Sequence, residues 1–323
     1  MNAMQRLQAW VDAARRVRDA YRTIAGINGR NRNLVKPLNP RSQYPLVDDK
    51  LACKHALSAA GVPVPATLAV LGRMADLSRL PEVLSCHPVA AIKPSRGLGG
   101  GGILLLFGER APGQYWRQPE SIARGAESAR QWATIGEIRG HLQQILAGQF
   151  AMDRRDDVAF LEELLISMPE IDRLSPGHVS DVRILVHRGV PVLAMTRAPT
   201  RVSGGRANLH QGAIGYGIDL ADGRAVAAIF RNRPIGRHPD TGLPLEAFVV
   251  PRWAELLDIA RRCAAAIPLG YLGVDIVLDR RHGPLVLELN ARPGLAIQVA
   301  NMRGLFSLVR PELPSGVIAG GAA

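Results

Sequence analysis

A lysine followed by a run of glycines is the first feature of this chain that can bind an anion. The segment KPSRGLGGGG spans Lys93–Gly102 between two apolar runs, PVAAIKPS at 88–95 and GGILLLF at 101–107. Glycines let backbone N–H groups close over phosphate oxygens. Ile103 follows instead of the Lys-Ser/Thr pair of a P-loop, and a strand-like run replaces the helix of a dinucleotide-binding turn. The pattern predicts either a phosphate-binding lysine with a glycine lid or a plain flexible hairpin.

Three side chains with hard oxygen atoms interrupt apolar runs near the C-terminal end. Asp275 lies in GVDIVLD (273–279), and Glu288 and Asn290 lie in GPLVLELN (283–290). Alternate residues of a strand share a face, and the short RRH connection allows the two strands to pair. Asp275 then lies opposite the other two, a donor set that suits Mg²⁺ with nucleotide phosphates. The alternative is a solvated polar face, although unpartnered carboxylates among apolar residues are costly.

Acidic residues also break the run FLEELLISMPE. Glu162 and Glu163 interrupt its first half, and Glu170 ends it. A carboxylate at a strand end can accept hydrogen bonds from ribose hydroxyls, and the backbone beside it can pair with an adenine edge. Taken alone, the run also fits an edge strand with solvated glutamates.

Most cations of this chain are arginines. The four lysines, against thirty-six arginines, are Lys36, Lys50, Lys54 and Lys93. Most arginines are therefore expected at the surface, but Arg183 and Arg197 lie within apolar strands of a predicted hairpin at 181–198. Arg206 and Asn208 follow in a loop. Arginine suits bidentate contact with carboxylate or phosphate, so this group predicts an anion site.

Several functional classes are disfavoured by the composition. With 47% hydrophobic residues the chain is expected to fold, and no apolar run approaches the ~18 residues of a membrane span. The charged N-terminus is unlike a secretory signal, and three scattered cysteines favour a reducing cytoplasm over a disulfide scaffold. No serine, cysteine or histidine has the context of a covalent nucleophile or a zinc ligand. We ascribe the net charge of +12 to compositional bias and solubility.

Hydrophobic periodicity predicts the elements that carry these residues. Strands are expected at 88–95, 101–107, 158–166, 181–198 (a hairpin turning at Arg188-Gly189), 273–279 and 283–290, and helices at 4–24, 48–60, 117–149 and 252–266. Residues 26–45 are expected to be irregular. Strands outnumber helices and hairpins replace β-α-β units, so the predicted class is α+β.

Taken in order, these motifs resemble the ATP-grasp superfamily, which includes D-alanine–D-alanine ligase and glutathione synthetase. The ordered set is DDKLACKHALSAAGVPVP, AIKPSRGLGGGG, FLEELLISMPE, DVRILV, RANLHQG and GVDIVLD…LVLELNARPG. Over residues 26–303 it is most similar to the alpha-L-glutamate ligase-related group, the sugar-transferase-associated ATP-grasp proteins. The resemblance implies two α+β lobes clamping ATP, with a basic N-terminal helix in place of a full leading domain.

The resemblance also implies a role for each motif. It implies ATP contacts from Lys50, Lys93, Glu162, Glu163, Leu165 and Glu170, and a lid that includes Gly97, Gly99, Gly100 and Gly101. It implies two Mg²⁺ ions, or Mn²⁺ in their place, on Asp275, Glu288 and Asn290. Around the reacting carboxylate and phosphoryl group it implies Arg183, Arg197 and Asn208. The sequence adds Arg292, after Asn290, as a residue that can contact an anionic substrate.

The activity implied is ATP- and Mg²⁺-dependent ligation of a carboxylate to an amine through an acyl-phosphate. The product is an amide, for example glutamate or another amino acid added to a peptide or amine acceptor. One alternative is an ATP-grasp kinase that phosphorylates a small molecule. A basic nucleic-acid-binding protein is disfavoured, because it would not explain Asp275 and Glu288 beside a glycine lid. The identities of the substrates, the oligomeric state and the role of the N-terminal helix stay open.

The expected domain organisation follows from the same resemblance. Residues 1–47 form the N-terminal helix and an Arg/Asn-rich segment, and residues 48–310 form the ATP-grasp domain. Within that domain the lid lobe covers about 65–165 and the catalytic lobe about 166–310. Residues 311–323 form a flexible tail.

Overall fold

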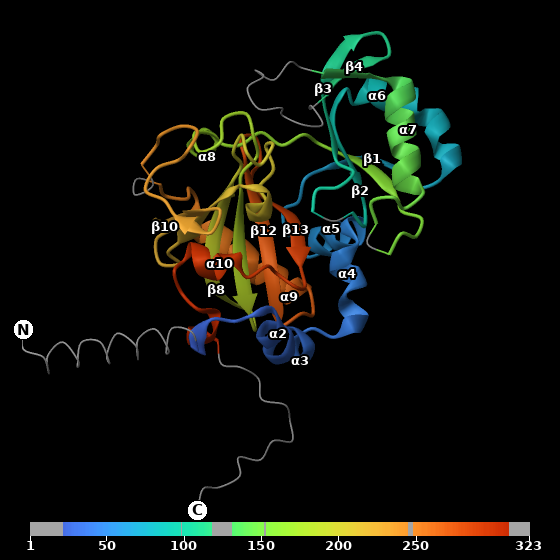
Figure 1. Ribbon diagram of the computed structural model, residues 1–323. Coiled ribbons are helices and arrows are strands. Elements are labelled where there is room, and N and C mark those ends of the chain that lie inside the picture. Colours follow the sequence, from blue (N-terminus) through green and yellow to red (C-terminus); the bar gives the residue numbers. More distant parts are fainter. Residues whose placement is uncertain (1–21, 98, 118–130, 152, 245–247, 310–323) are drawn as a thin grey trace, which may run out of the picture.

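Two antiparallel sheets dominate the structure, a computed structural model that describes residues 22–97, 99–117, 131–151, 153–244 and 248–309. The small sheet stands at the upper right of Figure 1 and the large sheet at the lower left. Helices pack on both, which is the α+β class expected from the sequence. Apart from its last residues, the predicted helix at 4–24 lies outside the described residues, and so does the predicted tail at 311–323.

The small sheet has six strands in the order β1-β6-β2-β3-β4-β5. They are β1 (Thr67–Leu71), β2 (Val89–Pro94), β3 (Leu104–Ala111), β4 (Gln114–Arg117), β5 (Gln131–Thr134) and β6 (Ala159–Glu162). One face packs against α6 (Leu80–Cys86) and α7 (Ile135–Leu146), and the apolar residues between them form a core. Lys93 and Glu162 point away from this core, because they alternate with its members Ile92 and Leu161.

The large sheet has seven strands in the order β11-β10-β9-β8-β7-β12-β13. They are β7 (Asp181–His187), β8 (Val190–Ala198), β9 (Ile214–Ile218), β10 (Ala225–Phe230), β11 (Arg233–Pro234), β12 (Tyr271–Asp279) and β13 (Gly283–Asn290). The helices α5 (Lys50–Ala59) and α9 (Trp253–Ala266) cover one face. On the other face α10 (Ala296–Ala300) crosses β9, where a Cβ on Gly217 would come within 2.3 Å of the Ala300 carbonyl oxygen.

The segment at 26–45 is helical, so the prediction of irregular chain was wrong. It contains α2 (Ile27–Arg30), a π-helical turn at Asn31–Val35, α3 (Lys36–Leu38) and a 3₁₀ turn at Arg41–Gln43, and α4 (Pro45–Asp48) follows. Leu34 and Val35 are buried against residues of the large sheet. Asn39 donates to the carbonyl oxygens of Tyr271 and Ala291, both at 2.7 Å. Packing on the sheet therefore overrides the weak local preference of this Asn- and Pro-rich segment.

Three other predicted boundaries need correction. The strand predicted at 158–166 covers only Ala159–Glu162. The helix predicted at 117–149 is confined among the described residues to α7, because Gln131–Thr134 pairs with β4 as strand β5. Thr134 and Glu137 form a capping box that starts α7 there. The strand predicted from residue 101 begins at Leu104. The hairpin turn at Arg188-Gly189 is confirmed, and both residues have positive φ, 49° and 79°.

Candidate functional site

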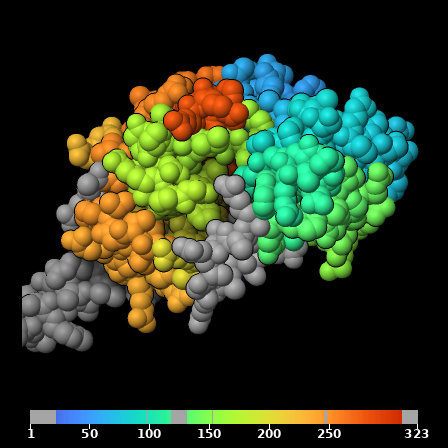
Figure 2. All heavy atoms as spheres, turned by 90° about the horizontal axis from the view of Figure 1, so that it is seen from above, coloured from blue at the N-terminus to red at the C-terminus, as the bar shows by residue number. Residues whose placement is uncertain are grey.

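A cleft of about 1900 Å³ separates the small sheet from the large one. The lobes that border it, cyan to green and yellow-green to red, are seen from above in Figure 2. The predicted site residues that line it are Lys93, Gly99, Gly100, Glu162, Glu163, Leu165, Arg183, Arg197, Asn208, Glu288 and Asn290. Those outside the lining are Lys50, Gly97, Gly101, Glu170 and Asp275. Chain segments far apart in sequence thus meet at one cavity.

On the small-sheet wall, Lys93 and Glu162 form an ion pair. Lys93 is on β2 and Glu162 is the last residue of β6, its neighbour in the sheet. Lys54, from α5, donates to the other oxygen of Glu162 at 2.6 Å. Burial works to raise the pKa of Glu162, but the two ammonium groups outweigh it and hold that pKa below its ordinary value. Glu162 is therefore an ionised, buried carboxylate with two cations.

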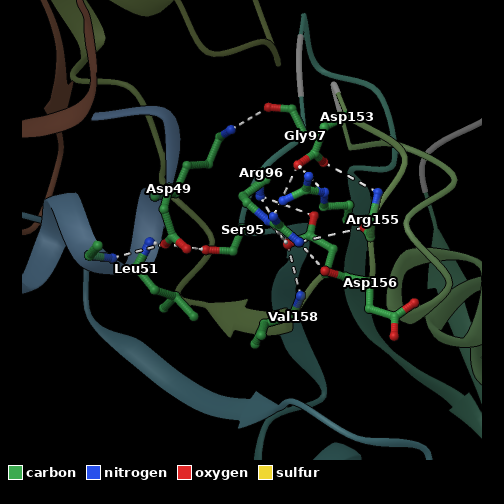
Figure 3. Close-up of polar contacts among 12 residues, drawn as sticks. Asp49, Leu51, Ser95, Arg96, Gly97, Asp153, Arg155, Asp156 and Val158 are labelled. Atoms are coloured by element: carbon green, nitrogen blue, oxygen red, sulfur yellow. Dashed lines mark hydrogen bonds and ion pairs between the residues drawn. The ribbon is translucent and has the colours of Figure 1, made fainter. Parts of the chain in front are cut away.

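The glycine run is fixed at its start by contacts that Figure 3 shows. The Ser95 hydroxyl donates to Asp49 at 2.6 Å and accepts from the Leu51 N–H at 3.2 Å, which ties β2 to the start of α5. Lys50 donates to the carbonyl oxygen of Gly97, so this predicted ATP contact is bonded to the glycine run and lies outside the cleft lining. The Arg96 N–H donates to Asp157 at 3.0 Å.

Further along the run the constraints differ from glycine to glycine. A Cβ at Gly97 would lie 2.3 Å from Pro94, and one at Gly102 would lie 2.7 Å from Phe150. Gly99 and Gly100 have positive φ and nothing within 4 Å of such an atom. The run is therefore held at both ends with open space at its middle, the arrangement expected of a loop that can close over a ligand.

The segment predicted to hold adenine and ribose is only partly gathered at the cleft. Beyond β6 the Glu163 carboxylate accepts from the Ala66 N–H at 3.0 Å and contacts the His282 ring at 3.0 Å. Leu165 is buried in a small apolar cluster beside the cleft. Glu170 lies on α8 (Pro169–Asp172), exposed and outside the cleft lining, so its predicted ribose contact requires a change in this segment.

The large-sheet wall carries a ladder of arginines and aspartates across neighbouring strands. Arg197 on β8 faces Asp181 on β7, and Arg183 on β7 faces Asp275 on β12. Arg183 Nε donates to Asp275 at 2.6 Å, and Arg197 donates to Asp275 at 2.7 Å and to Asp181 from Nε at 2.7 Å. Burial raises the pKa of Asp275, but the two guanidinium groups outweigh it and hold that pKa well below its usual range.

Glu288 adds a carboxylate to this wall for which the described residues show no ion pair. It lies directly opposite Asp275 between β13 and β12, and Asn290 donates to Asp275 at 3.3 Å. Burial raises the pKa of Glu288, and the neighbouring Asp275 charge raises it further against the opposing charges of Lys50 and the arginines. The ladder and Glu288 together therefore hold three carboxylates against two arginines.

The residues present fit a divalent cation that also binds a substrate. Asp275, Glu288 and Asn290 supply oxygen donors next to one another, and the raised pKa of Glu288 indicates that a nearby cation would be favourable. No three His, Cys, Asp or Glu side chains of the described segments gather as a ready metal cage. Phosphate oxygens would have to complete the coordination, as is usual for Mg²⁺.

Sequence reasoning missed Lys54 and Asp181, which hold Glu162 and Arg197. The scarcity of lysine marked Lys54, and Asp181 is two residues before Arg183 on the same strand face. Arg292 lies outside the cleft lining: it pairs with Asp48 at 2.9 Å and stacks over Tyr44, so the structure gives no support for its contact with a substrate.

The cleft thus lies between two lobes, each built on an antiparallel sheet, and the motifs that resemble ATP-grasp proteins lie along it. Residues 29–311 match the sugar-transfer associated ATP-grasp family, and the chain therefore belongs to this family. It has the α+β ATP-grasp fold expected from its motifs. Within the described residues, no helix is both long enough and apolar enough to cross a bilayer.

Solved structures similar to this chain are distant in sequence. The RimK domain protein ATP-grasp from Sphaerobacter thermophilus DSM 20745 is 15% identical over 84% of this chain and 71% of that one, with a TM-score of 0.45. The ATP-grasp ligase PsnB complexed with minimal precursor is 17% identical over 85% of this chain and 59% of that one, with a TM-score of 0.37. D-cycloserine synthetase DcsG is 15% identical over 80% of this chain and 67% of that one, with a TM-score of 0.43. A comparison with curated proteins finds no match.

Proposed function

We propose that this chain is an ATP- and Mg²⁺-dependent ligase that joins a carboxylate to an amine through an acyl-phosphate. The observation that carries the proposal is the opposite net charge of two clusters at the cleft, the two lysines on Glu162 and the arginine–aspartate ladder with Glu288. Lys93 shares Glu162 with a second lysine, so the first cluster has one cation more than carboxylates. Glu288 gives the second cluster one carboxylate more than cations. Mg·ATP has phosphate oxygens for the first cluster and a divalent cation for the second.

Each group has a separate task in this proposal. Lys93 and the N–H groups of Gly99 and Gly100 bind the phosphates. Asp275, Glu288 and Asn290 hold Mg²⁺, two ions when the nucleotide is bound, and Mn²⁺ can substitute. Bound Mg²⁺ supplies Lewis-acid polarisation of the phosphoryl oxygens.

The arginines act on the second substrate. A carboxylate brought against the γ-phosphate meets a like charge, and Arg183, Arg197 and Asn208 lower the cost of that approach. The carboxylate oxygen bonds to the γ-phosphorus as ADP leaves. The amine nitrogen then bonds to the acyl carbon, phosphate leaves and the amine loses a proton. The substrates supply both nucleophiles, so the protein needs none. An amino acid such as glutamate, with a peptide or amine acceptor, fits this scheme.

Hydroxylamine trapping tests the proposal. With Mg·ATP, a pool of carboxylates and hydroxylamine, the enzyme should yield a hydroxamate and ADP in equal amounts. Arg197→Ala should depress both products together, because Arg197 acts at phosphoryl transfer, whereas Arg79→Ala, at an exposed position beside α6, should leave both unchanged. ADP release with a stable phosphomonoester and no hydroxamate would move the protein to the kinase alternative.

A further inference from the structure

Lys54 is a buried lysine beside the cleft that has no task in the proposed reaction. It is 7% exposed, is absent from the cleft lining, and lies with its Nζ 5.5 Å from the centre of the Phe160 ring. Its hydrogen bond runs to Glu162 Oε2 at 2.6 Å, while Lys93 takes Oε1 of the same carboxylate. Lys54 is therefore too enclosed to contact a ligand in the cleft, and its neighbour Glu162 is only 1% exposed.

Lys54, Glu162 and Lys93 form a trio of charges, and their balance explains why Glu162 needs two lysines. A lone Lys93–Glu162 pair would be neutral, and a phosphate would have to compete with the buried carboxylate for the ammonium group. Buried charge is strongly held by its partner, because water cannot screen it. With Lys54 on the other oxygen, Glu162 keeps a counter-ion when Lys93 turns toward a ligand. The trio then offers one net positive charge to the cleft.

We propose that Lys54 is a positioning residue for phosphate binding, which neutralises Glu162 so that the charge of Lys93 is available to the nucleotide. This inference rests on the ATP-binding part of the proposed function and on none of its later steps. The ligand class is a polyphosphate anion. Lys54 acts through Glu162, and of these three side chains only Lys93 touches the ligand.

The Lys54–Glu162 bond can also stabilise the fold, and the test must distinguish this structural role from charge compensation. The Cys53 and Leu57 side chains of α5 belong to the core of the large sheet, while Glu162 belongs to the small sheet. The Lys54–Glu162 bond therefore joins the two lobes. A purely structural bond and a charge-compensating one both weaken when Lys54 is removed. They differ when Glu162 loses its charge as well, because this restores the free charge of Lys93 without restoring the bond.

The experiment measures Mg·ATP affinity by calorimetry in four variants, with thermal unfolding of each. Lys54→Met should weaken Mg·ATP binding by about tenfold, the size of one charged hydrogen bond. Lys54→Met/Glu162→Gln should return the affinity to within about twofold of wild type, since the carboxylate that would hold Lys93 is then removed as well. Lys93→Met should bind Mg·ATP weakly. Lys36→Met, at an exposed lysine on α3, should bind Mg·ATP as wild type does.

Two results would overturn this role of Lys54. One is wild-type affinity in Lys54→Met. The other is an affinity that stays low in the double variant, which would make the bond structural. Failure of the ligase proposal has a different signature, Mg·ATP binding in wild type without any hydroxamate, and the four affinities still decide the role of Lys54 in that case.

Discussion

Each side of the cleft carries a cluster in which one carboxylate binds two cations, but the two clusters differ in net charge. We call Lys54, Lys93 and Glu162 the basic wall, and the ladder of Arg183, Arg197, Asp181 and Asp275 with Glu288 the acidic wall. On the small sheet one carboxylate, Glu162, holds two lysines. On the large sheet one carboxylate, Asp275, holds two arginines, but further carboxylates flank it in Asp181 and Glu288. The first cluster has one cation more than its anions, and the second has one carboxylate more than its cations. A phosphate suits the first wall and a divalent cation suits the second.

The walls also differ in how the chain builds them. The arginine–aspartate ladder comes from adjacent strands of one sheet, so cross-strand register fixes every pair. The lysine cluster combines a helix packed on the large sheet with two strands of the small sheet. The acidic wall is therefore expected to be rigid, whereas the basic wall depends on how the lobes meet. Four predictions test this contrast, and the first has the largest expected effect.

Asp275→Asn should break the acidic wall most severely. It leaves Arg183 buried beside a neutral group and Arg197 with Asp181 alone, and removal of one partner from a buried ion pair costs about 3–5 kcal/mol. Urea unfolding should report that loss in the free energy of unfolding. Asp258→Asn is the matched control, because Asp258 is exposed on α9 with only a surface contact to Arg262. Equal stability of the two variants would contradict the ladder.

Glu288→Gln should separate activity from folding on the same wall. The amide keeps the shape of the side chain but removes the surplus charge, so turnover should fall by at least about 100-fold while the free energy of unfolding holds or rises. ADP release across a Mg²⁺ titration, with thermal unfolding, measures both. Glu82→Gln, exposed on α6, is the control. Full turnover in Glu288→Gln would move the metal site elsewhere.

Lys93→Ala should weaken the basic wall without unfolding it. The loss of one charged hydrogen bond to phosphate is about 1.5–3 kcal/mol in Mg·ATP affinity. Glu162 keeps Lys54 as its counter-ion, so the unfolding midpoint should change little. Calorimetry measures the affinity, with Lys36→Ala as control, and wild-type affinity in Lys93→Ala would remove Lys93 from the nucleotide site.

Local patterns in the sequence predicted the acidic wall better than the basic one. Alternation along GVDIVLD and GPLVLELN was enough to predict Asp275 opposite Glu288, because the period of a strand and a short connection fix register. The bond between Lys54 and Glu162 spans 108 residues and two sheets, and no local period encodes such a contact. The pairing of the arginines with Asp275 could not be predicted either, because the sequence of a strand does not determine which strands lie next to it in the sheet.

The segment at 26–45 illustrates the same limit in the fold. Its Asn, Gly and Pro residues predict turns, yet Leu34 and Asn39 are buried against the large sheet and the backbone is helical. Tertiary contacts decided the structure there, and the sequence offered only a few scattered apolar residues, Ile27, Leu34, Val35 and Leu38, as a signal. The family motifs predicted the α+β class and the ATP-grasp fold, whereas the contacts of Lys50 and Glu170 depended on packing that motifs do not contain.

The smallest predicted effect is a pH dependence of stability that belongs to the basic wall. The two lysines hold the pKa of Glu162 below its unfolded value of 4.5, against the opposing effect of burial. The unfolded chain therefore takes up this proton first as the pH falls, so Glu162 contributes stability above pH 4.5 that is lost progressively on acidification. Lys54→Met/Glu162→Gln removes the titrating group.

Unfolding free energies from pH 6 to pH 3 should consequently fall less steeply in that double variant than in wild type, while Glu82→Gln should run parallel to wild type. Burial lowers the pKa of Lys54 from 10.5 against the opposing charge of Glu162, and the double variant removes Lys54 together with that carboxylate. Identical slopes in all three proteins would mean that Glu162 is not held ionised by the lysines. The free charge assigned to Lys93 would then lose its basis, and the contrast between the two walls would reduce to the acidic one.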